Sequence, residues 1–134
     1  MKKVTQFICL LMIMSMILAI PGFAAEQASH FFASHSCYLW EVSDSEFQVC
    51  FDVTAVGQMD VLGASEIKVQ RSTDKSNWTT VATYYDYYEY DTSFSSDEIT
   101  YSSRSDGYYY RAKVTFHAEN DYGVGEYIDY TSYI

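Results

Sequence analysis

The chain has 134 residues, with 18 acidic and eight basic side chains and a formal net charge of −10. A surface of this sign repels phosphate backbones and anionic lipid headgroups, which disfavours binding to nucleic acids and to anionic membranes. The length is that of one domain with its own core, and the charge leaves cations and basic partners possible.

Residues 1–24 have the pattern of a secretory signal peptide. Two lysines form a basic start, residues 7–20 are apolar, and residues 21–24 place small side chains before a cleavage point. A membrane anchor needs about 20 apolar residues, and no lipoprotein cysteine follows the apolar run, so both alternatives are weaker. We expect a secreted domain of residues 25–134 without membrane insertion after cleavage. Loss of Lys2 and Lys3 would leave six basic residues against 18 acidic ones, a net charge of −12.

Two cysteines, Cys37 and Cys50, remain in the mature chain, an even number in an oxidising compartment. Apolar residues alternate around both, and a hairpin turning at residues 43–44 would place the cysteines directly opposite each other. The same register would place Trp40 opposite Phe47 on the other side of the hairpin. We therefore expect a disulfide between Cys37 and Cys50. Metal ligation and redox chemistry are weaker alternatives, because two thiols alone make a poor zinc site and their spacing is not C-x-x-C.

The mature chain is rich in Tyr, Val, Thr, Phe and Ile, which predicts β-strands and almost no helix. About seven strands are expected, over residues 30–42, 46–56, 65–71, 78–85, 99–102, 107–119 and 126–133. Residues 57–64 are expected to be a connection, residues 72–77 a polar turn, and the acidic residues 86–98 a long loop. This series predicts an antiparallel β-sandwich with Greek-key links.

Two segments resemble parts of fibronectin type III domains, which are immunoglobulin-like (Ig-like) sandwiches. Ile67 to Ser72, a polar turn and Trp78 to Ala82 resemble the central hairpin of that fold. Tyr108 to Val114, followed by the turn at residues 120–125, is similar to its penultimate strand and final turn. The resemblance implies that Tyr108 is a corner tyrosine whose hydroxyl bonds to nearby backbone. It also implies that four side chains point inward: Tyr110, Ala112, Val114 and Phe116.

Most of the mature chain also resembles a family of small exported proteins of unknown function from Gram-positive anaerobic bacteria. Its marks are Met59 to Ala64, Ile67 to Arg71 and Tyr110 to Phe116. The chain departs from the fibronectin pattern because it lacks the N-terminal prolines and adds a cysteine pair. The shared sandwich is therefore a firmer implication than the strand order, and fold alone implies no activity.

Catalytic motifs are missing from the sequence. The three histidines, His30, His35 and His117, are scattered, and the serines lack a G-x-S-x-G turn. With 18 acidic residues, two carboxylates at a glycosidase separation would arise by chance. We therefore expect a protein without catalytic residues, a metal site or a cofactor, with calcium as a weak possibility. The hard carboxylate ligands that calcium takes are present at Asp86, Glu89, Asp91, Asp97 and Glu98.

Five tyrosines lie between residues 84 and 90, and they are the candidate ligand-binding residues: Tyr84, Tyr85, Tyr87, Tyr88 and Tyr90. Tyrosine offers a large, stiff contact area at low entropic cost, which suits a surface that recognises an extracellular protein or glycan. The alternative is an edge strand with core and surface tyrosines. We expect extracellular recognition or adhesion through residues 57–64 and 84–98. A structural protein that self-associates through this edge is the second possibility, and the oligomeric state stays open.

Overall fold

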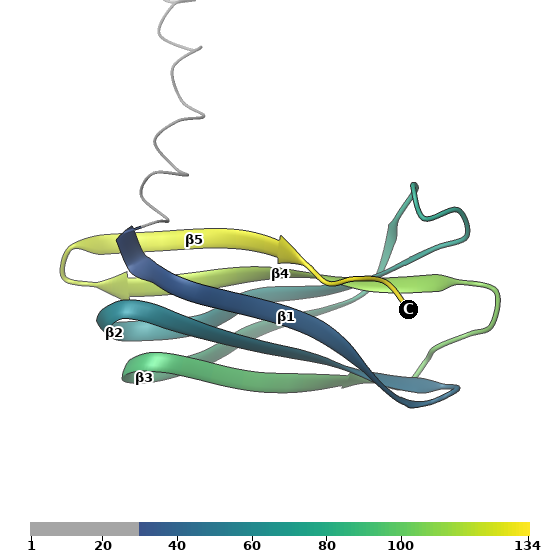
Figure 1. Ribbon diagram of the computed structural model, residues 1–134, viewed down its shortest axis with the longest axis horizontal. Helices are drawn as coiled ribbons and strands as arrows, with labels where there is room; N and C mark the ends of the chain where they lie inside the picture. The colour runs from purple at the N-terminus through teal and green to yellow at the C-terminus, as the bar shows by residue number, and fades with distance from the viewer. Residues whose placement is uncertain (1–29) are drawn as a thin grey trace, which may run out of the picture.

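The computed structural model describes residues 30–134, so the predicted signal peptide lies outside the described residues. The chain forms five strands, β1 (Phe32–Ser43), β2 (Glu46–Ser72), β3 (Thr79–Tyr101), β4 (Tyr109–Asn120) and β5 (Gly123–Tyr130) (Figure 1). Every pairing between them is antiparallel, which confirms the predicted all-β class. Within the described range, no helix has the length and apolar character needed to cross a membrane.

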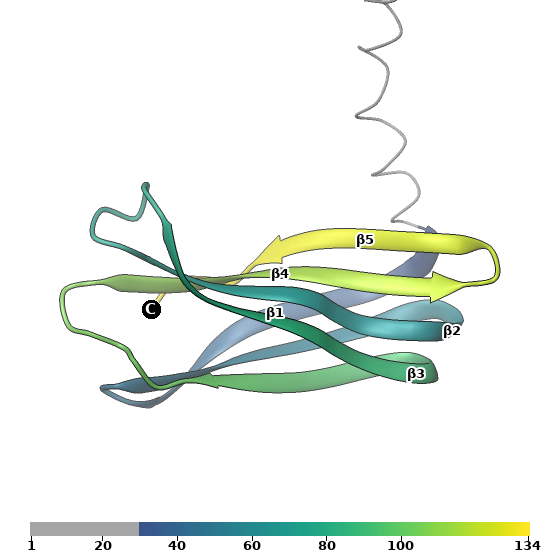
Figure 2. The same ribbon diagram turned by 180° about the vertical axis from the view of Figure 1, so that it is seen from behind.

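The strands form one sheet that curls over on itself, as Figures 1 and 2 show from opposite sides. Residues 46–55 of β2 pair with β1 on one side and with residues 94–101 of β3 on the other. We call these three segments the front layer. Residues 59–72 of β2 pair with residues 79–92 of β3 and with β4, which pairs in turn with β5. These four segments are the back layer, and the two layers face each other as in a β-sandwich.

The core lies between the layers and is built from every second residue of the central strands. Phe51 of β2 packs against Phe116 of β4 with ring centroids 6.0 Å apart, and Phe47 packs against Tyr110 at 5.5 Å. A fully buried phenylalanine side chain stabilises the fold by about 1.5–3 kcal/mol. The predicted inward set on β4 is confirmed, because four side chains are fully buried: Tyr110, Ala112, Val114 and Phe116.

The number of strands differs from the prediction because two predicted breaks lie inside strands. Residues 57–64 belong to β2 and residues 86–98 belong to β3. Both strands pass from one layer to the other at a corner formed by residues 55–58, where the β2–β3 register shifts. The Gln58 amide donates a hydrogen bond to the Asp91 carbonyl oxygen there, at 3.2 Å. Glycine and acidic residues favour breaks in isolation, but pairing along the neighbouring strands outweighs that preference.

The predicted disulfide is wrong because the β1–β2 register differs by one residue. The tight turn falls at Asp44 and Ser45, and a β-bulge precedes it in β1, between Glu41 and Ser43. Cys37 therefore lies opposite Phe51, and Cys50 lies opposite Tyr38. A shift of one residue exchanges the two faces of a strand, so the two thiols point to opposite sides of the hairpin and are free.

The same shift overturns the predicted packing of the aromatic side chains of β1. Trp40 lies opposite Gln48 rather than Phe47, and it is 61% exposed on the outer face of the front layer. Tyr38 lies on the same outer face and is also exposed. The inward positions of β1 are instead taken by residues that are partly buried against the core, among them Cys37 and Leu39.

The tyrosine whose hydroxyl bonds to nearby backbone is Tyr110 and not Tyr108, to which the resemblance assigned this role. The buried Tyr110 hydroxyl accepts a hydrogen bond from the backbone N–H of Ser105 at 3.0 Å. Tyr108 is exposed, and its ring lies 4.4 Å from the guanidinium carbon of Arg71. Because alternate residues of β4 face the core, the tyrosine that enters the core at the start of the strand is the one that can reach back to the preceding loop.

Candidate functional site

The five candidate tyrosines are divided between the two faces of β3. Tyr84 and Tyr87 are partly buried and pack against the core. They lie opposite inward-facing residues of β2, namely Ile67 and Ala64. The other three, Tyr85, Tyr88 and Tyr90, lie on the outer face of the back layer. The structure therefore brings three of the five together on a surface and removes two from it.

Two neighbouring irregularities, one in β2 and one in β3, determine which of these tyrosines face outward. Ser65 is an extra residue of β2 relative to β4, and its hydroxyl donates a hydrogen bond to the Thr115 carbonyl oxygen at 3.2 Å. Next to it on β3, Asp86 has a φ of 63°, a left-handed backbone conformation that aspartate tolerates better than most residues. Ser65 in β2 and Asp86 in β3 are thus one extra residue each, and both lie between the pairs Ala64–Tyr87 and Glu66–Tyr85. As a result, Tyr85 and Tyr88 share a face although they are three residues apart.

Gly63 opens a space in the middle of the outer face. It pairs with Tyr88 of β3 on one side and with His117 of β4 on the other. With no side chain between them, the rings of Tyr88 and His117 approach with centroids 5.4 Å apart. Only glycine fits here, because a Cβ atom at residue 63 would lie 2.0 Å from the Tyr87 carbonyl oxygen.

We call the outer surface of this part of the back layer the tyrosine face, defined by Tyr85, Tyr88, Tyr90, Val61, Val124 and Ile128. Its residues come from β3, β2 and β5, and His117 of β4 lies among them. Tyr85 is 61% exposed and Tyr90 is 66% exposed. Val124 and Ile128 are also exposed, so apolar and aromatic atoms reach solvent across three strands.

Acidic side chains border this face. Glu119 and Glu126 lie 3.5 and 3.6 Å from the two ring nitrogens of His117. Burial, Asp86 and Glu126 raise the pKa of the Tyr88 hydroxyl above its usual value, in that order of size. Carboxylates therefore lie on both sides of the centre of the face, at Asp86 and at Glu119 and Glu126.

The five carboxylates considered for calcium do not form a cluster. Asp86, Glu89 and Asp91 lie on the back-layer part of β3, and Asp97 and Glu98 lie on the front-layer part. The Glu98 carboxylate accepts a hydrogen bond from the Gln48 amide at 3.1 Å. Over residues 30–134, no group of three or more histidine, cysteine or acidic side chains is arranged to hold a metal ion.

A second group of polar residues, which the sequence did not indicate, lies where β1 meets β5. His35 Nδ1 is 3.3 Å from Asp129 Oδ2, and the His35 ring is 4.2 Å from the Tyr127 ring, measured between centroids. Cys37 lies two residues along β1 on the same side. Burial, Asp129 and Asp52 raise the pKa of the Cys37 thiol to about 12, so it is protonated at neutral pH. Only the alternation of His35 and Cys37 was visible in the sequence, because Asp129 is more than 90 residues away along the chain.

The other two histidines are placed apart from this group. His30 is exposed at the start of the described chain, and His117 lies on the opposite side of β4 from Phe116, whose ring contacts His35.

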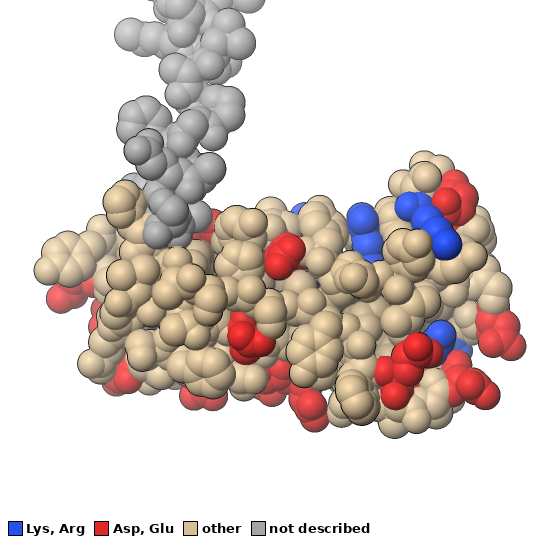
Figure 3. Space-filling view, in the orientation of Figure 1, with Lys and Arg blue, Asp and Glu red and all other residues tan. Residues whose placement is uncertain are grey.

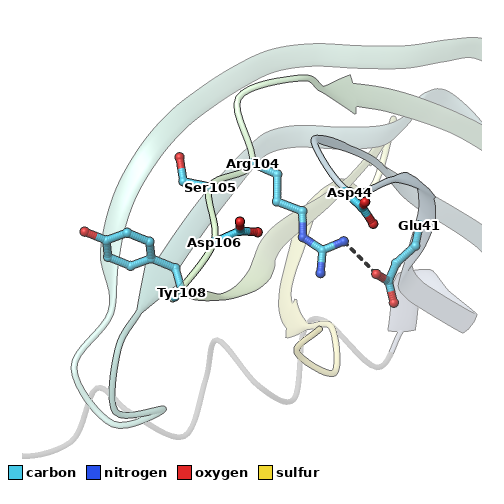
Figure 4. A pocket seen from close by; sticks show the side chains of 7 residues that line it. Glu41, Asp44, Arg104, Ser105, Asp106 and Tyr108 are labelled. Atoms are coloured by element: carbon cyan, nitrogen blue, oxygen red, sulfur yellow. Dashed lines mark hydrogen bonds and ion pairs between the residues drawn. The ribbon is translucent and has the colours of Figure 1, made fainter.

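A small depression at one end of the sheet joins the β1–β2 turn to the loop before β4 (Figure 4). An ion pair of 2.6 Å between Arg104 and Glu41 crosses it, and the Arg104 N–H donates to the Ser45 carbonyl oxygen at 3.1 Å. Asp44, Asp106 and Tyr108 line its remaining walls. The bonds that Arg104 makes to Glu41 and to Ser45 join the two loops, so this depression includes a structural contact.

Comparison of the chain with protein-family models, with curated proteins and with solved structures gave no match. Its function is therefore inferred from the geometry and charge of the described residues.

Proposed function

We propose that this protein is a secreted, non-catalytic, Ig-like β-sandwich module that recognises an extracellular protein or glycan through the tyrosine face. The observation that carries the proposal is the exposure of Tyr85 and Tyr90 on β3, with Val124 and Ile128 exposed on the same outer surface at β5, beyond β2 and β4. Exposed apolar and aromatic side chains gathered on one surface mark interaction sites on soluble proteins. Tyrosine also presents a rigid ring and a hydrogen-bonding hydroxyl together, which suits recognition.

Two structural features support the Ig-like assignment. Divided at their corners, β2 and β3 supply two segments each, so that three segments lie in the front layer and four in the back layer. The hydroxyl of Tyr110 accepts a backbone hydrogen bond from five residues upstream, at the start of the penultimate strand. Both features resemble the fibronectin type III and immunoglobulin-like arrangement. Secretion is supported by the pattern of residues 1–24.

The test is a screen of protein recovered from expression of the full chain against arrays of cell-surface proteins and glycans, with and without calcium. The double variant Tyr85→Ser/Tyr90→Ser should lose the binding that the wild type shows. The variant Trp40→Ser is the control, because Trp40 is equally exposed but lies on the outer face of the front layer. Absence of saturable binding, or equal binding by the double variant, would overturn the proposal.

A structural, self-associating protein is the second candidate, favoured by the free edge of β3. Among the described strands, β3 pairs only with β2, and its residues 79–85 carry no charge. An uncharged, unpaired edge is a template for pairing with another strand. Light scattering that rises with protein concentration, and that Thr80→Lys abolishes, would favour this candidate over recognition, since Thr80 is exposed on this edge.

A further inference from the structure

We infer that the partner of the tyrosine face is an extended protein segment rich in lysine and arginine. The inference rests on the proposed function, and it specifies the chemical class of the ligand. Three features of the molecule support it: the charges around the face, the contacts that the chain's own cations make, and the length of the exposed tyrosine row.

The charged side chains that β3 contributes around the face are all acidic. No lysine or arginine occurs anywhere in β3, whereas Asp86 and Asp91 directly follow its exposed residues Tyr85 and Tyr90. Glu89 pairs with the buried Leu62, so it lies on the other side of the strand. Glu119 and Glu126 continue the acidic border onto β4 and β5, and both are about half exposed. A cationic ligand would therefore be attracted and oriented by the face, whereas a second acidic copy of the chain would be repelled.

Most of the chain's own cations are already engaged within the chain, and one of them, Lys68, pairs with Glu66 next to Tyr85 at one end of the face. Six basic residues remain beyond Lys2 and Lys3, and two of them form ion pairs, Lys68 with Glu66 and Arg104 with Glu41. Three others stack on aromatic rings at the end of the back layer next to the β2–β3 turn: Arg71, Lys75 and Arg111. Figure 3, which views the front layer, likewise shows the basic side chains gathered at the end that holds this turn.

Those stacked cations show how a ligand cation can bind to this sheet. The Arg111 guanidinium carbon lies 4.3 Å from the Trp78 ring centroid and 4.6 Å from the Tyr130 ring centroid. Among the residues described, no lysine or arginine stacks on Tyr85, Tyr88 or Tyr90. The same sheet surface therefore has filled cation–aromatic contacts at one end and unfilled tyrosines with carboxylate neighbours at the other.

The length of the row favours a polypeptide over a single small cation. Five residue steps separate Tyr85 from Tyr90, which corresponds to about 16 Å along a strand. An extended segment of similar length presents alternate side chains to one surface, so that two or three basic residues can reach the tyrosines together. Asp86 and Asp91 both have left-handed φ values, of 63° and 51°, which interrupt the strand edge. Docking therefore uses the side chains of the face rather than strand addition at the edge.

The test uses a fluorescent peptide that alternates lysine and serine, titrated into protein recovered from expression of the full chain while anisotropy is recorded. We expect saturable binding that weakens with added salt, and about tenfold weaker binding by Tyr85→Ser/Tyr90→Ser. Trp40→Ser should bind like the wild type, and Glu119→Gln/Glu126→Gln should bind more weakly with a smaller salt dependence. Thermal unfolding of each variant confirms that it is folded.

Three results would overturn the inference: no binding of the lysine peptide, equal binding of a matched glutamate peptide, or equal weakening by Trp40→Ser. The last would mean diffuse attraction to an acidic protein rather than a site. Failure here is distinct from failure of the proposed function. A neutral glycan or protein that binds the wild type and is lost in the tyrosine variant would retain the recognition role with a different ligand.

Discussion

The ring of Tyr88 on β3 lies 5.4 Å from the ring of His117 on β4, and Gly63 of β2 occupies the ladder position between them. Three strands thus contribute to one feature of the outer surface. It depends on a glycine for two separate reasons. The backbone there has a φ of 155°, and the Cβ of any other residue would collide with the β3 backbone.

Replacement of Gly63 by alanine should destabilise the fold. The added Cβ would meet the Tyr87 carbonyl oxygen, and the φ of 155° is one that residues with a side chain rarely adopt. We expect a loss of at least about 1–3 kcal/mol in the free energy of unfolding, measured by urea denaturation. Gly57→Ala is the matched control, since no atom lies within 4 Å of its added Cβ. Equal stability of both variants would show that the two strands are not in this register.

Replacement of Tyr110 by phenylalanine should remove the hydrogen bond from Ser105 while the ring keeps its packing. A hydrogen bond of this kind contributes about 1 kcal/mol, so the free energy of unfolding should fall by about that amount. Tyr108→Phe should leave stability unchanged, because the Tyr108 hydroxyl makes no hydrogen bond among the described residues. The reverse order of effects would restore Tyr108 as the corner tyrosine.

Asp74 should make stability depend on acid pH. Its carboxylate accepts hydrogen bonds from the Asn77 backbone, the Asn77 side chain, the Ser76 backbone and the Ser72 hydroxyl. These bonds, led by that from the Asn77 N–H, hold its pKa well below the ordinary value. A lowered pKa in the folded state stabilises the protein above the unfolded-state pKa, and this stabilisation is lost as the pH falls through the folded-state pKa.

Asp74→Ala should therefore melt at a lower temperature than the wild type at neutral pH, and the difference should shrink below about pH 4. Asp121→Ala tests the same substitution in the β4–β5 turn, where the carboxylate accepts no hydrogen bond from the described residues. A gap in melting temperature that persists unchanged into strong acid would refute this account of the turn.

The two thiols should react with alkylating reagents at different rates. Burial and two neighbouring carboxylates raise the pKa of Cys37 to about 12, and Cys50 is on the outer face of the hairpin beside Tyr38. In the native protein at mildly alkaline pH, mass spectrometry should find Cys50 alkylated well before Cys37. After denaturation both should react. Recovery of a peptide in which Cys37 is linked to Cys50 would contradict the register.

Sequence patterns predicted the strand content and the inward side of β4 because Tyr110, Ala112, Val114 and Phe116 alternate without interruption. They failed where an extra residue changes the alternation. A bulge between Glu41 and Ser43 separates the cysteines, and the paired irregularities at Ser65 and Asp86 put Tyr85 and Tyr88 on one face. Such irregularities depend on neighbouring strands, so the single sequence does not reveal them.

The sequence therefore located the tyrosine segment of the candidate site, but it did not show which of its tyrosines are on the surface. The sequence indicated the segment of five tyrosines, but only the pairing with β2 separates Tyr84 and Tyr87, against the core, from the three on the surface. The contribution of β4 and β5, through His117, Glu126 and Ile128, was not visible at all. His117 joins the face through its pairing with Gly63, which is 54 residues earlier in the chain, and Glu126 and Ile128 join it through the pairing of β5 with β4.

The most direct test of the central claim, that the tyrosine face binds the partner, is to map the contact surface residue by residue. Amide chemical shifts of the nitrogen-labelled protein would be followed during titration with the lysine–serine peptide. The account predicts saturable shifts that cluster at Tyr85, Tyr88, Tyr90, His117 and Glu126. Shifts centred on Trp40, shifts spread evenly over the acidic surface, or no saturable shift would contradict it.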